Sequence, residues 1–469
     1  MEIDNLKIDN FEITHSKLHM VSYGLGATIN QFFQMAFSAL GFYFYEVEIG
    51  LNVWLTSLGY IIFAIWNAIN DPLSGYLTDR PFKFTQKWGR RFPWMLIGGI
   101  PWLFSYILIF FPPDVDPDSG ALILFIWLVF TTCLFDTFNS LWWVHFYSLY
   151  PDKFRSARER RIAAGIITPV GILGVALGGI IPPLLISYGS KQTFLYQAFV
   201  VVIFNVFFFC LALPGWRDDK VNVERYLKKY RESQKNQSFL EAIKLSLKHK
   251  NFGVYIVLNI FFSAMGFCIQ ASIPYVVRYV LGTSSSSQII LQIAFLTGSL
   301  VSTPLWIKFA NKVNNNRKVL ILSTVMMIIF TFPLSFFTGL IPLFITLFLW
   351  GFGYGGMWSL MRACIADVIN ESIVISGKRQ EGVYNGIMQF FGRFALILQA
   401  LTFAIVHGLT NFDEEASFQS SEAIWGIQLH FGIIPMIYMI IGIAVFWKWY
   451  TLIPSKLNYY EIKIKEMGL

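Results

Sequence analysis

Residues Trp66–Trp94 read WNAINDPLSGYLTDR followed by PFKFTQKWGRRFPW, and they join an apolar run to a basic loop. Asp71 lies inside the apolar run, where a carboxylate costs about 2.5–3.5 kcal/mol on membrane-insertion scales. Asn67 comes one helical turn earlier, on the same helix face. The segment then ends in positive charge that includes Arg90 and Arg91. A buried acid followed by a basic loop predicts a site inside a membrane with a gate at its cytoplasmic mouth.

The composition is that of a polytopic membrane protein. The 469 residues are 55% hydrophobic and only 14% charged, whereas soluble domains carry about 25% charged residues. The net charge of +8 would suit a nucleic-acid partner, but the charges are sorted by loop, which excludes that class. All four cysteines lie in apolar runs, so we expect free thiols. The N-terminal residues mix acids and bases, which is not the pattern of a cleavable signal peptide.

Twelve runs are long enough to cross a bilayer, which needs about 20 apolar residues per helix. An even number of spans places both termini on one side of the membrane. The predicted spans are 19–46, 51–78, 93–112, 121–150, 161–187, 193–213, 252–281, 286–310, 318–338, 340–369, 382–409 and 425–452.

The loop charges give the orientation. Basic residues concentrate in the loops that follow even-numbered spans, and the other loops hold acids and almost no Lys or Arg. By the positive-inside rule, both termini are expected in the cytoplasm, with the chain in the cell membrane. The basic residues are Arg80, Lys83, Lys87, Arg90, Arg91, Lys153, Arg155, Arg158, Arg160, Arg161, Lys312, Arg317, Lys318, Lys378 and Arg379.

One long polar insert divides the chain into six spans and six spans. Residues 1–213 are predicted to form an N-terminal bundle and 252–452 a C-terminal bundle. Residues 214–251 are a cytoplasmic linker with a short surface helix, and 453–469 a cytoplasmic tail. This all-α layout of two six-helix bundles is that of major facilitator transporters. Glycine-rich stretches in the fifth and tenth spans predict close helix packing.

Polar residues follow single faces of several spans, as the lining of a solute pathway requires. Amides between helices often only bond their neighbours. Ionised groups in the interior are costly, so Asp71, Asp136 and Arg393 are the functional candidates. The other polar positions are Asn30, Gln31, Gln34, Asn67, Asn70, Ser74, Thr78, Asn139, Ser140, Trp143, Tyr147, Asn259, Gln270, Gln288, Gln292, Asn385, Gln389 and Gln399.

The sequence carries no set of residues that predicts an enzyme. We find no Ser-His-Asp arrangement, no Cys/His cluster with metal-ligand spacing and no phosphate-binding glycine loop. We expect no cofactor, and if this chain transports a solute, the transport must use an ion gradient, because the sequence shows no ATP-binding module.

Four stretches resemble the glycoside–pentoside–hexuronide:cation symporters, the group that contains the bacterial melibiose permease. They are SYGLGATINQF in the first span, WNAINDPLSGYLTDR…WGRRFPWMLIG, LFDTFNSLWWVHFYSLYP in the fourth span, and ADVINESIVISGKRQEGVYNG before the eleventh. The resemblance therefore runs through both halves. It implies a twelve-helix fold, alternating access, and import of a small solute with Na⁺ or H⁺.

The resemblance also implies site residues. The family's cation site has two acids one turn apart, of which this chain keeps Asp71 and replaces the other with Asn67. The family's acidic positions that bind sugar hydroxyls align with Gln31 and Trp143. A lysine in the family's helix 1 aligns with Asn30, and an arginine in its helix 5 aligns with Thr168. Asp136 fits a variant found in other members, and Arg393 keeps a family charge. The substrate-binding prediction is Gln31, Asp136, Asn139, Trp143, Gln389 and Arg393, and the cytoplasmic gate prediction is Gly75, Asp79, Arg90 and Arg91.

Several alternatives stay open. Asp71 beside Asn67 suits either a Na⁺ ion that further oxygens also bind, or a proton. Na⁺ is the only metal expected. Arg393 would hold a carboxylate or phosphate of an anionic solute. The eukaryotic lysolipid symporters resemble the same family, so an amphipathic solute is a second hypothesis, and a receptor without turnover is a third. The expected partners are a small solute, a monovalent cation and the lipid bilayer, with one chain sufficient.

Overall fold

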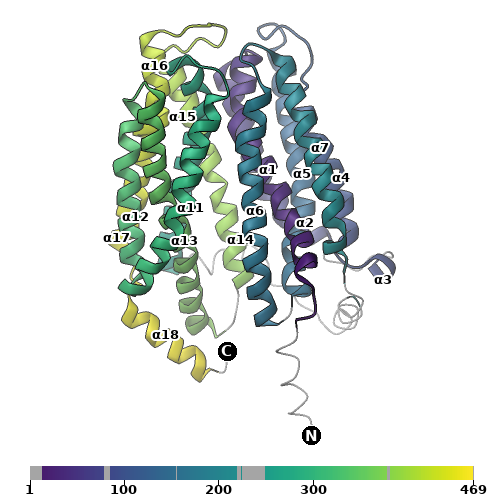
Figure 1. Cartoon of the computed structure of the whole chain (residues 1–469), viewed down its shortest axis with the longest axis vertical. Helices are drawn as coiled ribbons and strands as arrows, with labels where there is room; N and C mark the ends of the chain where they lie inside the picture. The colour runs from purple at the N-terminus through teal and green to yellow at the C-terminus, as the bar shows by residue number, and fades with distance from the viewer. Residues whose placement is uncertain are drawn as a thin grey trace. The chain divides into compact units, whose positions relative to one another are not determined.

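The computed structural model describes residues 13–78, 85–154, 156–218, 223, 249–377 and 381–467, and these are mainly helical with no strand among them. The chain divides into two compact units, residues 1–235 and 236–469, each with its own helix packing (Figure 1). The domain boundaries predicted from the sequence remain a prediction, and most of the linker with its short helix lies outside the described residues.

In unit 1, the helices follow the predicted spans with ends shifted by a few residues. A short helix precedes α4, and α1 continues into a π-helical turn. The elements are α1 Lys17–Tyr43, η1 Phe44–Glu48, α2 Val53–Thr78, α3 Thr85–Trp88, α4 Phe92–Ile109, α5 Ala121–Lys153, α6 Ala157–Leu185 and α7 Lys191–Trp216.

In unit 2, π-helical turns extend α10 and join α16 to α17. The elements are α10 Lys250–Tyr275, η2 Val276–Val280, α11 Ser287–Val313, α12 Asn316–Thr331, η3 Phe332–Ser335, α13 Leu340–Ser376, α14 Glu381–Gly392, α15 Phe394–Leu409, α16 Ser421–Gln428, η4 Leu429–Ile433, α17 Ile434–Trp449 and α18 Pro454–Glu466.

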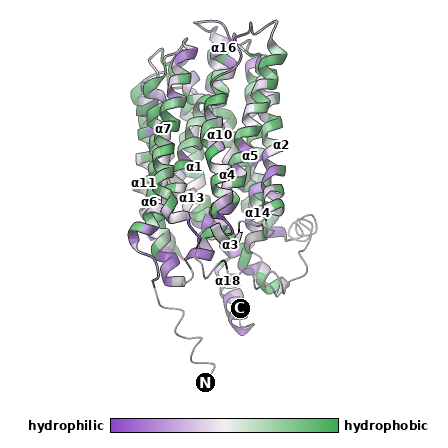
Figure 2. Ribbon diagram, turned by 90° about the vertical axis from the view of Figure 1, so that its right-hand side faces the viewer, coloured by the Kyte–Doolittle hydropathy of each residue, from purple (hydrophilic) through white to green (hydrophobic). Residues whose placement is uncertain are grey.

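Eleven helical segments among the described residues are long and apolar enough to cross a membrane. The first predicted span, α1, is not one of them, because residues such as Asn30, Gln31 and Gln34 lower its hydropathy. Figure 2 shows hydrophobic residues along the long helices and hydrophilic ones gathered near α3 and α18. A helix with polar residues along its length belongs where protein or water, not lipid, surrounds those residues.

Glycines allow close helix packing in both units, as the glycine-rich stretches predict. In unit 1, a Cβ on Gly174 of α6 would lie 2.1 Å from the Thr28 carbonyl oxygen of α1. In unit 2, a Cβ on Gly298 of α11 would lie 2.1 Å from the Phe348 carbonyl oxygen of α13. Both backbones approach so closely that only a residue without a side chain fits.

Three details go beyond the sequence-based expectation. The eleventh span has a one-residue irregularity at Arg393, which keeps helical backbone angles (φ −66°, ψ −23°) between α14 and α15. The C-terminal tail contains α18, which packs on α13. Glu46 and Glu48, which follow α1, lie buried in η1, where the Glu48 carboxylate accepts hydrogen bonds from the Gly189 backbone N–H.

Candidate functional site

The predicted acids Asp71 and Asp136 lie on facing surfaces of α2 and α5. The Ser140 hydroxyl of α5 donates to Asp71 Oδ1 at 2.5 Å. In the opposite direction, Asn67 Nδ2 of α2 donates to Asp136 Oδ1 at 2.6 Å. Asn70 Nδ2 donates to Asp136 Oδ2 at 3.2 Å. We call Asn67, Asn70, Asp71, Asp136 and Ser140 the α2–α5 cluster.

The α2–α5 cluster is rich in oxygen atoms and partly open. Asp136 is 5% exposed and Asn67 6% exposed, whereas Asp71 is half-buried. The Asn67 side-chain oxygen is buried and accepts no hydrogen bond from any of the described residues. A buried acceptor without a donor costs free energy unless an ion, a water or a ligand satisfies it. Together with the two carboxylates, this oxygen gives three oxygen-bearing side chains of the kind that hard cations prefer.

A polar seam continues from the α2–α5 cluster along the same two helices. The Ser74 hydroxyl donates to Asn70 Oδ1 at 3.3 Å, and the Thr78 hydroxyl donates to the Ser74 carbonyl at 2.6 Å. His145 Nε2 lies 2.9 Å from the Thr78 hydroxyl oxygen. Buried side chains on both helices are therefore hydrogen-bonded from the cluster toward the end of α2 that precedes Arg90 and Arg91.

The predicted substrate residues of unit 1 lie beside the cluster. Asn139 Nδ2 of α5 donates to Asn30 Oδ1 of α1 at 3.3 Å, which joins a third helix to the pair. Gln31 is exposed, although it lies in the middle of α1. Trp143 is half-buried and packs against Trp142, Phe146 and Tyr147.

The predicted substrate residues of unit 2 lie in the eleventh predicted span. Gln389 is half-buried in α14, and Arg393 forms the N-cap of α15. A Cβ on Gly392 would lie 3.6 Å from Asn259 Nδ2 of α10. Arg393 keeps helical backbone angles (φ −66°, ψ −23°), and Val383–Leu409 is long and apolar enough to cross a membrane as one segment.

The predicted gate region of unit 1 carries a network of charges. Arg91 Nε donates to Asp152 Oδ2 of α5 at 2.7 Å. The backbone N–H groups of Arg91 and Phe92 donate to Asp218 Oδ2 at 2.8 and 3.0 Å. Burial nevertheless raises the pKa of Asp218 above its ordinary value. Gly75 and Arg90 are half-buried.

Asp79, the remaining residue of the predicted gate, lies outside the described residues. The sequence reasoning missed Asp152 and Asp218 as partners of Arg91. The available signal was the pair of short acid-containing segments at the ends of α5 and α7, which share the basic end of the unit.

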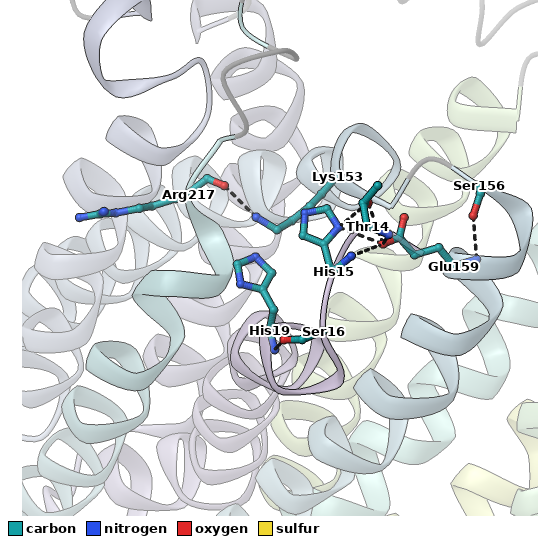
Figure 3. Close-up of polar contacts among 8 residues, drawn as sticks. All are labelled: Thr14, His15, Ser16, His19, Lys153, Ser156, Glu159 and Arg217. Atoms are coloured by element: carbon teal, nitrogen blue, oxygen red, sulfur yellow. Dashed lines mark hydrogen bonds and ion pairs between the residues drawn. The ribbon is translucent and has the colours of Figure 1, made fainter. Parts of the chain in front are cut away.

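The start of the described chain is tied to the same end of unit 1. Figure 3 shows Thr14 and His15 turned toward Glu159 at the start of α6. Glu159 Oε1 accepts hydrogen bonds from both backbone N–H groups, at 3.1 and 2.9 Å, and from the Thr14 hydroxyl at 3.0 Å. Nearby, the Lys153 ammonium donates to the Arg217 carbonyl at 2.8 Å. These contacts hold the first residues, the α5–α6 connection and the end of α7 together.

Among the described residues, no group of three His, Cys, Asp or Glu side chains could hold a metal ion. The four cysteines are free thiols.

Known proteins share this sequence pattern and this architecture. The sodium-dependent lysophosphatidylcholine symporter 1-A of Danio rerio is 21% identical over 451 residues, covering 88% of this chain and 82% of that protein. The glucuronide carrier protein homolog of Escherichia coli K12 is 22% identical over 454 residues, covering 95% and 94%. The crystal structure of a D-xylose-proton symporter has the same fold, with a TM-score of 0.65, 15% identity, and coverage of 92% of this chain and 97% of that one.

The fold and the polar residues within its spans define a polytopic membrane transporter of the major facilitator type and not an enzyme. The chain belongs to the family of MFS/sugar transport proteins, which it matches over residues 22–452. The resemblance found in the sequence motifs is thereby confirmed at the level of the family.

Proposed function

We propose that this protein is a cation-coupled symporter that imports a small, sugar-like solute across the cell membrane by alternating access. Both termini lie in the cytoplasm, and a single chain in the bilayer suffices. The observation that carries the proposal is the α2–α5 cluster: two carboxylates and one unsatisfied amide oxygen on facing membrane helices.

In the proposed mechanism, the coupling cation binds at Asp71 and Asn67, with Asp136 as an additional oxygen donor. The cation is either Na⁺, held by these oxygen-bearing side chains, or H⁺ on a carboxylate. Charge neutralisation removes the cost of leaving the carboxylates exposed to a closing, water-poor interior. The loaded and empty states therefore differ in the free energy of closing unit 1, which is the requirement for coupling.

The substrate-binding residues are proposed to be Gln31, Asp136, Asn139 and Trp143 in unit 1 and, in unit 2 taken by itself, Gln389 and Arg393. Asp136 accepts from Asn67, so it would sense both the ion and the solute. At the cytoplasmic end, Gly75, Asp79, Arg90 and Arg91 form the proposed gate. The contacts of Arg91 with Asp152 and Asp218 support that role, because an ion pair and two backbone hydrogen bonds can break and re-form as helix ends move.

The test is uptake into proteoliposomes with a panel of sugars and sugar acids, under separate Na⁺ and pH gradients. Asp71→Asn is expected to abolish gradient-driven accumulation while leaving solute exchange without a gradient. Glu48→Gln is the matched control, because Glu48 is another buried acid of unit 1 but lies outside the α2–α5 cluster. Undiminished concentrative uptake by Asp71→Asn would refute the coupling role.

A lysolipid-like solute is the second candidate, favoured by the similarity to a lysophosphatidylcholine symporter over most of both chains. Competition for binding distinguishes the two classes: a lysolipid that displaces a bound sugar tenfold more effectively than other sugars do would favour the second.

A further inference from the structure

The start of α12 and the end of α17 meet at one edge of unit 2. The Arg317 guanidinium of α12 donates to the Trp447 carbonyl of α17 at 2.5 Å, and the two helices pack against each other (Figure 1). The membrane-crossing segment Asn316–Ser335 begins at this edge, and the segment Ser421–Trp449 ends there. The contact therefore lies at the ends of two spans, which is the depth of lipid headgroups and not the centre of a bilayer.

Both helices carry a stripe of exposed apolar residues that starts from this edge. The stripes consist of Leu322, Val325 and Ile329 of α12 and of Ile437, Ile440 and Trp447 of α17. Lys318 precedes Leu322 by one helical turn on the same face, and Lys448 directly follows Trp447; both lysines are exposed. A wholly apolar exposed face on a membrane span is stable against lipid, so the two ammonium groups stand at the rim of a lipid-facing surface.

The positive charges at this edge are not neutralised by the protein. Within the described part of the chain, none of Arg317, Lys318 and Lys448 forms an ion pair. Asp367 of α13 reaches the same edge, but its Oδ2 accepts from Asn316 Nδ2 at 3.0 Å. The Arg317 Nε–H is buried, and no described group accepts from it. An unsatisfied buried donor costs free energy, and the lysines attract an anion, so the edge is complementary to a negatively charged group.

We propose that Arg317, Lys318, Trp447 and Lys448 bind the headgroup of an anionic phospholipid, and we call them the α12–α17 lipid site. The phosphate oxygens accept from the guanidinium and ammonium groups, the acyl chains lie along the two apolar stripes, and the Trp447 ring lies at the level of the glycerol. A zwitterionic phosphatidylcholine has the same phosphate but adds a cationic choline, which the three basic residues repel. The site does not depend on which solute or ion the protein transports.

The experiment compares dioleoylphosphatidylglycerol with dioleoylphosphatidylcholine, which have the same acyl chains. Each is titrated into the full chain in detergent micelles, and native mass spectrometry counts the bound lipids and gives an affinity for the first one. The wild type is expected to bind phosphatidylglycerol at least roughly tenfold more tightly, because each basic residue near a lipid phosphate contributes roughly fivefold in affinity. The double variant Lys318→Gln/Lys448→Gln is expected to reduce that preference at least roughly fivefold.

Lys456→Gln/Lys465→Gln is the matched control. It removes the same charge from two exposed lysines of unit 2, but these belong to α18, which is not one of the membrane-crossing segments of the described chain. We expect this variant to keep the wild-type preference. A second control adds inorganic phosphate in excess, which should not displace phosphatidylglycerol, because the acyl chains contribute to binding. A melting curve for each variant shows that the fold is retained.

The inference is overturned if the wild type binds both lipids equally, or if Lys318→Gln/Lys448→Gln keeps the preference. Equal losses in the two double variants would also overturn it, because they would show a general effect of surface charge. Displacement of the lipid by inorganic phosphate would assign the edge to a free anion instead. None of these outcomes measures transport, so failure of the lipid site and failure of the proposed symporter are distinguishable.

Discussion

The contact between α1 and α6 gives a prediction whose size follows from the geometry. A methyl group on Gly174 would lie 2.1 Å from the Thr28 carbonyl oxygen, and real Cβ contacts essentially never fall below 3.0 Å. Since 3.0 − 2.1 = 0.9, the two backbones must separate by at least 0.9 Å. The Thr28 hydroxyl also donates to the Val170 carbonyl at 2.7 Å across the same contact, so separation strains a hydrogen bond as well.

We expect Gly174→Ala to lower the free energy of unfolding by about 1–3 kcal/mol, the usual cost of overpacking. Gly165→Ala is the control on the same helix, because a Cβ there meets nothing within 4 Å. It should be neutral or stabilise by up to about 1 kcal/mol, because alanine restricts the unfolded chain. Denaturant titration in mixed micelles, followed by tryptophan fluorescence, measures both. Equal stability of the two variants would refute the inference that α1 and α6 pack backbone to backbone.

Two further predictions concern the charges at the basic end of unit 1. Burial raises the pKa of Asp218, so the folded state holds the carboxyl proton more tightly than the unfolded chain does. The stability of the wild type should therefore fall relative to that of Asp218→Asn as the pH rises from about 4 through the raised pKa. Unfolding titrations from pH 4 to 7 measure this difference, and parallel stability curves for the two proteins would contradict it. Arg91→Gln breaks the ion pair with Asp152, whose side chain is 40% exposed, so the free energy of unfolding should change by less than about 1 kcal/mol. The transport rate should change at least roughly fivefold. An unchanged transport rate would exclude Arg91 from the gate.

The spans were predictable from the sequence because transfer into lipid is a local property. Each residue contributes to hydropathy independently of what it contacts, so long apolar runs could be located before any helix was paired with another. The same reasoning marked Asp71, Asp136 and Arg393, since a charge in an apolar run is costly wherever the helix lies. Glycine spacing likewise indicated close packing, which Gly174 and Gly298 confirm.

Pairings between helices could not be predicted in the same way. Asn67 was read beside Asp71 as one ion site on α2, with Asp136 assigned to the solute, yet Asn67 donates to Asp136 across the helix pair. Asp152 and Asp218 gave no periodic signal that connects them with Arg91.

The sequence by itself determined that this chain is an all-helical membrane protein with costly charges inside its spans. Tertiary structure alone decided which groups satisfy those charges, which of their oxygens remain open, and that Arg317 bonds to the carbonyl of Trp447. The reason is that hydrophobic transfer adds up residue by residue along the chain, whereas a hydrogen bond or a stacked pair depends on the rotation and neighbours of two helices distant in sequence.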